Sequence, residues 1–248
     1  MPFSALDIAA LVWFIAMMAA FELITTLSRF ADSSLSAGVA RHRRAWLAHM
    51  VERDQRHFDA ILLASLSQSN AFFASTSVLG IGGLAAIMGS GDAARHMLER
   101  LPMVSETTPA LWEIKILFLI SILIYAFFKF AWAFRLSHYS AIMFGAMPPS
   151  ADDDHAQERR RHGLYAARLL DLVGQHANSG LRSFYYAFAA IAWLFHPVLF
   201  MMAMTLVFAI LIRREFVSRA TRIITEAAPH ALRDEIYSSS AATKCDDS

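Results

Sequence analysis

Two opposite charges inside apolar blocks are the first residues of this sequence that could do chemistry. Glu22 lies near the end of the first block and Lys129 near the end of the third. If both blocks cross a membrane in the same direction, the two side chains fall at similar depth. An intramembrane charge costs about 2.5–3.5 kcal/mol on insertion scales, and an opposite charge nearby offsets this cost. We therefore expect a Glu22–Lys129 ion pair that holds the helices together, or a proton or cation site at Glu22. The alternative is that Lys129 only extends to the membrane interface and Glu22 makes a local contact.

Polar side chains also mark the start of the second apolar block. Gln68 and Asn70 enter it from the same side as Glu22 and Lys129. Side chains of this kind hydrogen-bond between helices inside a bilayer. They predict a polar half of the helical bundle, which either lines a small cavity or joins neighbouring helices.

His196 is the one histidine deep in an apolar block, and it is followed by Pro197. A histidine at such a depth is a candidate haem ligand or proton relay. A bis-histidine haem needs a second histidine at similar depth, and the sequence offers none. We therefore expect no cofactor, with haem at His196 as the alternative, and expect His196 to bond to a neighbouring helix or to the carbonyl that Pro197 frees.

A dense charged group lies between the first two blocks, next to an aromatic residue. It consists of Trp46, Arg53, Asp54 and Arg56. Asp54 falls on the apolar stripe of this segment, so we expect it to pair with an arginine across the bundle. Neither this group nor the rest of the chain has the residue spacing of a metal site, a catalytic triad or a phosphate-binding loop. The sequence therefore assigns no catalytic residue and no metal ligand.

The elements that must position these residues are membrane-spanning helices. The chain is 56% hydrophobic and 17% charged, and its apolar residues form long blocks. Blocks of about 20 apolar residues are long enough to cross the hydrocarbon core. We predict an all-α integral membrane four-helix bundle with amphipathic cytoplasmic helical segments, the first of them over residues 40–58. A single membrane domain covers residues 1–234, with spans at about 6–27, 71–88, 111–134 and 184–212, and residues 235–248 form a disordered tail.

The positions of the basic residues predict an orientation of the chain in the membrane, but the arginines after the last span contradict it. They are concentrated in the first and third connections, which places these connections in the cytoplasm and the N-terminus outside. Four crossings then put the C-terminus outside as well, although Arg213 and Arg214 follow the last span directly. We favour a single crossing kinked at Pro197, because proline removes a backbone donor. The alternative is a re-entrant hairpin that returns the tail to the cytoplasm.

Five stretches together carry a family resemblance. They are WLAHMVERDQRHFD at residues 46–59, FFASTS with GIGGL in the second span, YAFFKFAW at 125–132, ARLLDLVGQHANSGLRSFYYAFAAIAWLFHP at 167–197 and RREFVSRA at 213–220. With them the chain resembles the membrane-protein family catalogued as domain of unknown function 599, which is found in bacteria and plants. The resemblance implies a four-span protein of a bacterial cytoplasmic (inner) membrane. It brings no activity and no catalytic residue.

Three functions fit these features, and none is nucleic-acid binding, because the net charge is only +1 and the basic residues form no single face. The first is a structural, interaction or assembly protein that binds the lipid bilayer and a membrane-protein partner, or itself as a homo-oligomer. The alternative is a small ion, proton or solute transporter that uses Glu22 and Lys129. The second alternative is a haem- or lipid-linked membrane enzyme.

Overall fold

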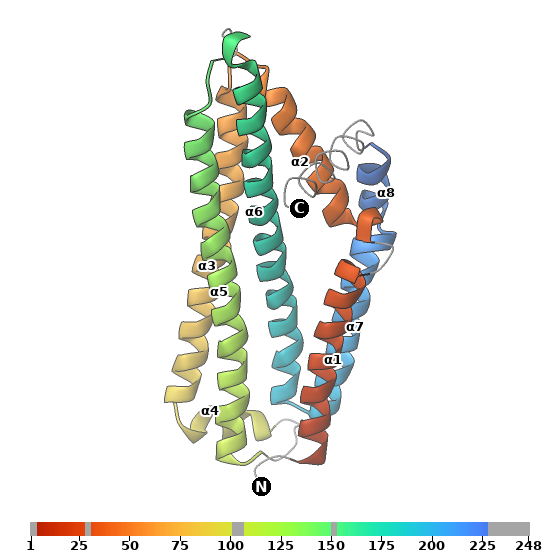
Figure 1. Ribbon diagram of the computed structural model, residues 1–248. Coiled ribbons are helices and arrows are strands. Elements are labelled where there is room, and N and C mark those ends of the chain that lie inside the picture. The colour runs from red at the N-terminus through yellow and green to blue at the C-terminus, as the bar shows by residue number, and fades with distance from the viewer. Residues whose placement is uncertain (1–3, 28–30, 101–106, 150–152, 228–248) are drawn as a thin grey trace, which may run out of the picture.

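The computed structural model describes residues 4–27, 31–100, 107–149 and 153–227, and within these ranges the chain is helical and has no strand (Figure 1). The predicted all-α class is therefore confirmed. The predicted tail at residues 235–248 lies outside the described ranges.

Within the described ranges, five helices form the body of the molecule, and three others flank it. The five are α1 (Ala5–Leu27), α3 (His57–Gly89), α5 (Pro109–Gly145), α6 (Ala156–Ile191) and α7 (Pro197–Ile212). The flanking helices are α2 (Leu35–Val51), α4 (Asp92–Glu99) and α8 (Arg219–Glu226), with 3-10 turns at Ala31–Ser33, Asp153–His155 and Ala192–Leu194 and a π turn at Arg213–Val217. Four segments within the described ranges are long and apolar enough to cross a membrane, namely Ala5–Thr26, His57–Gly89, Pro109–Gly145 and Pro197–Glu226.

The last of these segments differs from the predicted span at 184–212. The chain does not pass through His196–Pro197 as one kinked helix: α6 ends at Ile191, and α7 begins at Pro197 and runs back in the opposite direction (Figure 1). Proline is favoured at the first position of a helix, where no intrahelical donor is lost. His196 caps α7, because its Nδ1 accepts a hydrogen bond from the Val198 N–H at 3.1 Å. The proline therefore starts a new helix instead of kinking one.

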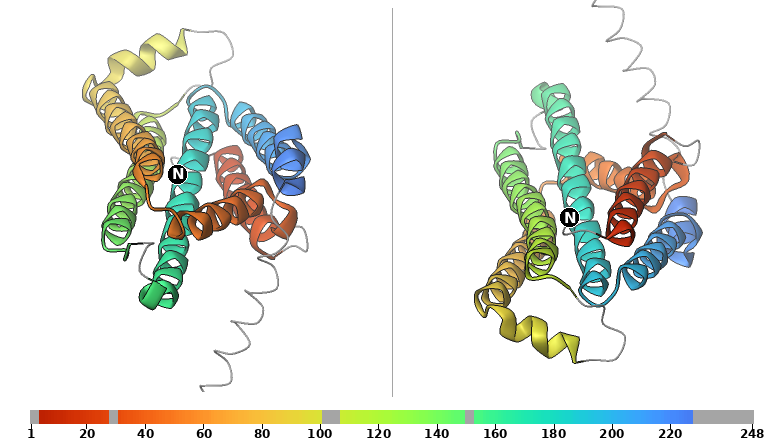
Figure 2. Two further views of the ribbon diagram at one scale, coloured as in Figure 1. Left: turned by 90° about the horizontal axis from the view of Figure 1, so that it is seen from above. Right: turned by 90° about the horizontal axis from the view of Figure 1, so that it is seen from below.

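Helix α6 lies between two groups of helices. Figure 2 shows α3 and α5 on one side of α6, and α1 and α7 on the other. Because α6 turns into α7, the segment after α7 returns to the end of the bundle where α2 lies, and α8 packs beside α2. We call this end, with α2, α8 and the adjoining parts of α3, α5 and α6, the arginine-rich end. The opposite end, which holds the start of α1 and the α6–α7 turn, is the N-terminal end.

Two separate apolar cores hold the helices together. The first joins α1, α5, α6 and α7 towards the N-terminal end, where Trp193 stacks on Phe200 with ring centroids 5.5 Å apart. The second lies at the arginine-rich end and joins α2, α3, α5 and α6. Its buried residues are Leu47, Met50, Val51, Leu63, Ala133, Leu136, Met147, Ala166, Ala167, Leu170 and Val173. The predicted amphipathic segment 40–58 contributes to this core, but its helix ends at Val51, and Phe58 belongs to α3.

Candidate functional site

The expected Glu22–Lys129 pair does not form. Oε1 of Glu22 instead accepts a hydrogen bond from Nη2 of Arg182 on α6, at 2.7 Å. The Arg182 guanidinium also lies 5.2 Å from the centroid of the Phe21 ring. Lys129 lies over the ring of Tyr125, with its Nζ 5.1 Å from the centroid. The prediction named the correct acid and the wrong base, because Arg182 precedes the start of the span as we drew it.

Two arginines of α2 converge on one carboxylate of α6. Asp171 accepts hydrogen bonds from Nη1 of Arg43 at 3.0 Å and from Nε of Arg44 at 2.8 Å. The guanidinium of Arg43 fits there because Gly174 has no side chain: a Cβ at this position would lie 2.7 Å from Nη2 of Arg43. Hydrogen bonds between charged groups are stronger than neutral ones. This cluster therefore fixes α2 across α6.

The segment after α7 is tied to the start of α2. Oε1 of the buried Glu215 accepts the backbone N–H of Ser36 at 2.9 Å, and Nε2 of His42 lies 2.9 Å from the carbonyl oxygen of Ile224. The guanidinium of Arg214 lies 5.8 Å from the centroid of the Tyr185 ring on α6. Together with the contacts of Asp171 and Glu22, these contacts join α1, α2 and the π turn after α7 to α6, and they join α8 to α2.

The predicted charged group at Trp46 is present, but it is organised by a different acid. Asp59, which is only 1% exposed, accepts hydrogen bonds from Nε1 of Trp46 at 2.6 Å and Nη1 of Arg53 at 3.0 Å. Asp54 lies exposed in the loop between α2 and α3, so the expectation that it occupies the apolar stripe is wrong. The helix stops before Asp54, and the stripe cannot be extended to it.

Arg56, in the loop between α2 and α3, makes further hydrogen bonds next to this charged group. Its guanidinium donates to the backbone carbonyls of Met147, at 3.2 Å, and Pro148, at 2.9 Å. It thereby connects the α2–α3 loop to the residues that follow α5. A polar cluster thus holds α2, α3 and the residues after α5 together at the far end of the second core; it consists of Trp46, Arg53, Arg56 and Asp59.

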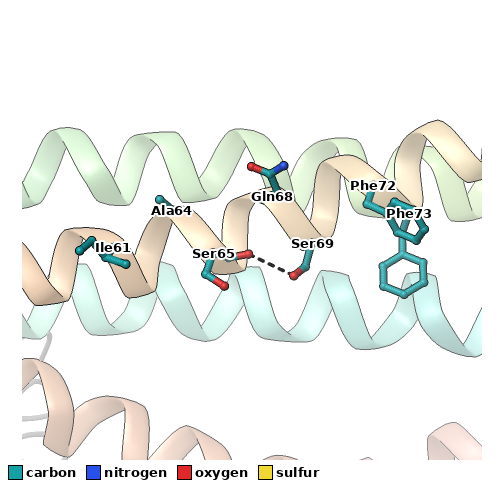
Figure 3. Close-up of a pocket in the computed structure, with 7 residues that line it drawn as sticks. All are labelled: Ile61, Ala64, Ser65, Gln68, Ser69, Phe72 and Phe73. Carbon is teal, nitrogen blue, oxygen red and sulfur yellow. Dashed lines mark hydrogen bonds between the residues drawn. The ribbon is translucent and has the colours of Figure 1, made fainter.

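The two amide side chains predicted at the start of the second span, Gln68 and Asn70, lie in different environments. Asn70 is buried against α5, whereas Gln68 is exposed. Gln68 belongs to a hollow of about 640 Å³ along α3. Figure 3 shows the seven residues that line it, all from this one helix: Ile61, Ala64, Ser65, Gln68, Ser69, Phe72 and Phe73.

The N-terminal end holds a buried ion pair that sequence reasoning missed. Asp7 on α1 accepts a hydrogen bond from Nε1 of Trp193 at 2.9 Å and from the Ser4 hydroxyl at 2.7 Å. Nζ of Lys115 on α5 lies 4.0 Å from the same carboxylate and 5.6 Å from the centroid of the Trp193 ring. Asp7 and Lys115 begin the first and third predicted spans. Both therefore lie at similar depth, as Glu22 and Lys129 do, and an ion pair between them could have been predicted on the same grounds.

The site residues as a set are engaged in contacts that hold helices to one another. The carboxylates described above bond to side chains or backbone of a different helix or turn: these are Asp7, Glu22, Asp59, Asp171 and Glu215. Among the residues that the structure describes, no three His, Cys, Asp or Glu side chains gather as a metal site would require. These polar contacts cross-link the helices. The hollow and the exposed surface of α3 take no part in them.

Comparison with known proteins identifies one match. The family model described as protein of unknown function, DUF599, matches residues 9–220. No curated protein and no solved structure matches the chain.

Proposed function

The chain belongs to the DUF599 family of proteins of unknown function, and we propose that it is an assembly protein of a membrane, a helical bundle that binds another membrane protein or a second copy of itself. The proposal gives it no catalytic residue and no cofactor. The charged residues support such a role, because they join the helices of a fixed frame. The transport alternative uses Glu22 and Lys129, and each of these residues contacts a different side chain, Arg182 and Tyr125 respectively.

The observation that carries the proposal is the exposed surface of α3. This helix packs on α5, and most of its remaining surface is open. Its 33 residues form a helix about 50 Å long, whereas the hydrocarbon core of a bilayer is only about 30 Å thick. The helix is therefore longer than a crossing requires. Figure 1 shows α3, α5 and α6 continuing past the end of α1, so the excess length lies at the arginine-rich end.

Large apolar side chains are exposed on this excess length. Phe58 is 64% exposed and Ile61 53% on α3, and Ile142 is 67% exposed on α5. Lipid tails do not reach beyond the hydrocarbon core, so a bilayer leaves these side chains in water or among headgroups. Exposed apolar groups outside the membrane are typical of protein interaction sites. A protein partner that covers them is the function best supported by this surface.

The proposal includes a topology with five crossings by α1, α3, α5, the second half of α6, and α7. It places the N-terminal end outside and the arginine-rich end in the cytoplasm of a bacterium, consistent with the positive-inside rule. The arginines after α7 no longer contradict that rule, because α8 lies beside α2. The polar first half of α6 then stands in the cytoplasm within the second core.

Photo-crosslinking tests the proposal directly. A benzophenone amino acid at Phe58 or at Ile142, in cells, is expected to give a discrete protein adduct, because these positions lie under the partner. The matched control is Val12, which is 62% exposed on α1 at a level that lipid covers, and which is expected to give no discrete adduct. The adducts are detected by immunoblot and their mass is measured. If Phe58 and Ile142 behaved like Val12, the assembly function would be refuted.

A further inference from the structure

Charged residues form two layers across the membrane-spanning part of the bundle. The first layer is the ion pair of Asp7 with Lys115 at the N-terminal end. Helices α1 and α5 both run away from this end, and Glu22 and Lys129 follow the two paired residues by about 14–15 positions (Figure 1). At 1.5 Å per residue, the second layer therefore lies about 21–23 Å from the first. Since the hydrocarbon core is about 30 Å thick, the layers fall near its two boundaries.

The second layer extends over the face of α6 between α5 and α1. The hydroxyl oxygen of Tyr125 on α5 lies 3.4 Å from that of Ser179 on α6. Arg182 follows Ser179 by one turn, so the two side chains are neighbours on α6. Arg182 bonds to Glu22 on α1, and Lys129 lies over the ring of Tyr125. Two cations thus flank a pair of hydroxyl groups.

The two layers differ in charge. In the first layer, Asp7 neutralises Lys115. In the second layer, Glu22 is bonded to Arg182, and Lys129 has no carboxylate partner in the described part of the chain. A cation at this depth is costly unless an opposite charge lies near it. The second layer therefore has one positive charge that the chain itself leaves uncompensated.

The residues around Lys129 indicate where its charge lies. The exposed side chains next to it on α5 are aromatic: Tyr125 is 49% exposed, Phe128 65% and Trp132 48%. Tyrosine and tryptophan are enriched where the hydrocarbon core meets the headgroups. Lys129 is thus at the level at which the phosphates of the lipids begin.

We propose that an anionic phospholipid supplies the missing charge, with its phosphate over Ser179, between Lys129 and Arg182. Lysine and arginine form strong charge-assisted hydrogen bonds to phosphate oxygens. The guanidinium of Arg182 has further N–H donors besides the one that bonds to Glu22. Between Tyr125 and Ser179 one hydroxyl donates to the other, so the second O–H is left for the phosphate.

The proposed topology gives the lipid its leaflet. With the arginine-rich end in the cytoplasm, the second layer faces the cytoplasmic leaflet, where anionic lipids attract lysine and arginine. The lipid site does not depend on the assembly function, because none of its residues belongs to the surface at Phe58 and Ile142 that would contact a protein partner.

Lipid titration of the purified protein in a neutral detergent tests the site. The dissociation constant of phosphatidylglycerol follows from the rise of the unfolding midpoint with lipid concentration. Lys129→Met is expected to raise this constant about tenfold, the effect of losing one charged hydrogen bond, whereas Lys129→Arg keeps it within about threefold. The wild type is expected to bind phosphatidylcholine about tenfold more weakly than phosphatidylglycerol, because its headgroup has no net charge.

Arg135→Met is the matched control, since Arg135 is an exposed cation on the same helix, further towards the arginine-rich end. It is expected to change the dissociation constant by less than about threefold, because a cation outside the site contributes only screened attraction. Equal weakening by Lys129→Met and Arg135→Met would overturn the inference, as would equal binding of the two lipids. If inorganic phosphate displaced phosphatidylglycerol, the site would bind a soluble anion and the lipid assignment would fall.

The unfolding midpoint without lipid separates binding from folding. Because Lys129 has no ion pair in the described structure, Lys129→Met is expected to leave this midpoint unchanged or to raise it. A lower midpoint would show that the chain itself compensates Lys129, which would also contradict the proposed site. The photo-crosslinking at Phe58 and Ile142 remains a separate test, so the assembly function and the lipid site can each fail alone.

Discussion

Asp7→Ala is expected to destabilise the protein by about 3–5 kcal/mol, the cost of removing one partner of a buried ion pair. Lys115 is 1% exposed, and Asp7 is the counter-charge that the structure gives it. Asp7 also accepts the indole N–H of Trp193, which would lose its acceptor in the core between α1, α5 and α6. The measurement is the thermal unfolding midpoint of the purified protein in detergent.

Two further variants separate the charge from the hydrogen bond. Asp7→Asn keeps an acceptor for Trp193 and removes only the charge, so it is expected to destabilise less than alanine. Adding Lys115→Met to Asp7→Asn removes the uncompensated cation, and the double variant is expected to recover most of the lost midpoint. A double variant no more stable than Asp7→Asn alone would show that the two charges do not interact.

Gly180→Ala is expected to destabilise the protein by about 1–3 kcal/mol, the usual cost of overpacking a core. A Cβ at this position would lie 2.7 Å from Cε2 of Phe130, whose side chain is 1% exposed. Phe130 cannot yield freely, because it lies against two other rings: it stacks on Phe73, with centroids 5.1 Å apart, and contacts the tilted ring of Phe184 at 5.8 Å. The extra methyl therefore pushes α6 away from α5 at the centre of the molecule.

The matched control for this substitution, Gly83→Ala, is expected to change the stability in the opposite direction. Gly83 lies inside α3, and a Cβ there meets no atom within 4 Å. Alanine is favoured over glycine inside a helix by about 0.5–1 kcal/mol, so Gly83→Ala is expected to leave the unfolding midpoint unchanged or raise it. If both alanine variants raised the midpoint, the close packing of α5 on α6 would be contradicted.

The sequence predicted the helices far better than their pairing. Apolar blocks located α1, α3 and α5, because a bilayer demands a minimum length of apolar helix. The end of α6 was instead joined to α7 in one predicted span at 184–212, and the part of α6 that carries Arg182 was left outside it. Only its position between the other helices makes such a sequence acceptable there (Figure 2). Predicting it therefore requires knowing the packing.

The error at Glu22 has the same origin. We chose Lys129 because it was the cation at the depth of Glu22 in a predicted span, whereas Arg182 stood just before another span. In the structure, the part of α6 that carries Arg182 lies beside the end of α1, so Arg182 and Glu22 form an ion pair. Similarly, Asp59 replaced Asp54 because one helix ended at Val51 and another began at His57. Helix ends at a loop of this kind are not determined by apolar periodicity alone.

The reversal at His196–Pro197 puts α2 and α8 on one side of the membrane. Cys245 is the sole cysteine and follows α8, so labelling it with a membrane-impermeant maleimide tests the claim most directly. Labelling is expected in inside-out vesicles and not in sealed right-side-out vesicles. A cysteine at Ser90, between α3 and α4 in a Cys245→Ser background, is expected to show the reverse. Labelling of Cys245 in sealed right-side-out vesicles would contradict the reversal and restore a single crossing through Pro197.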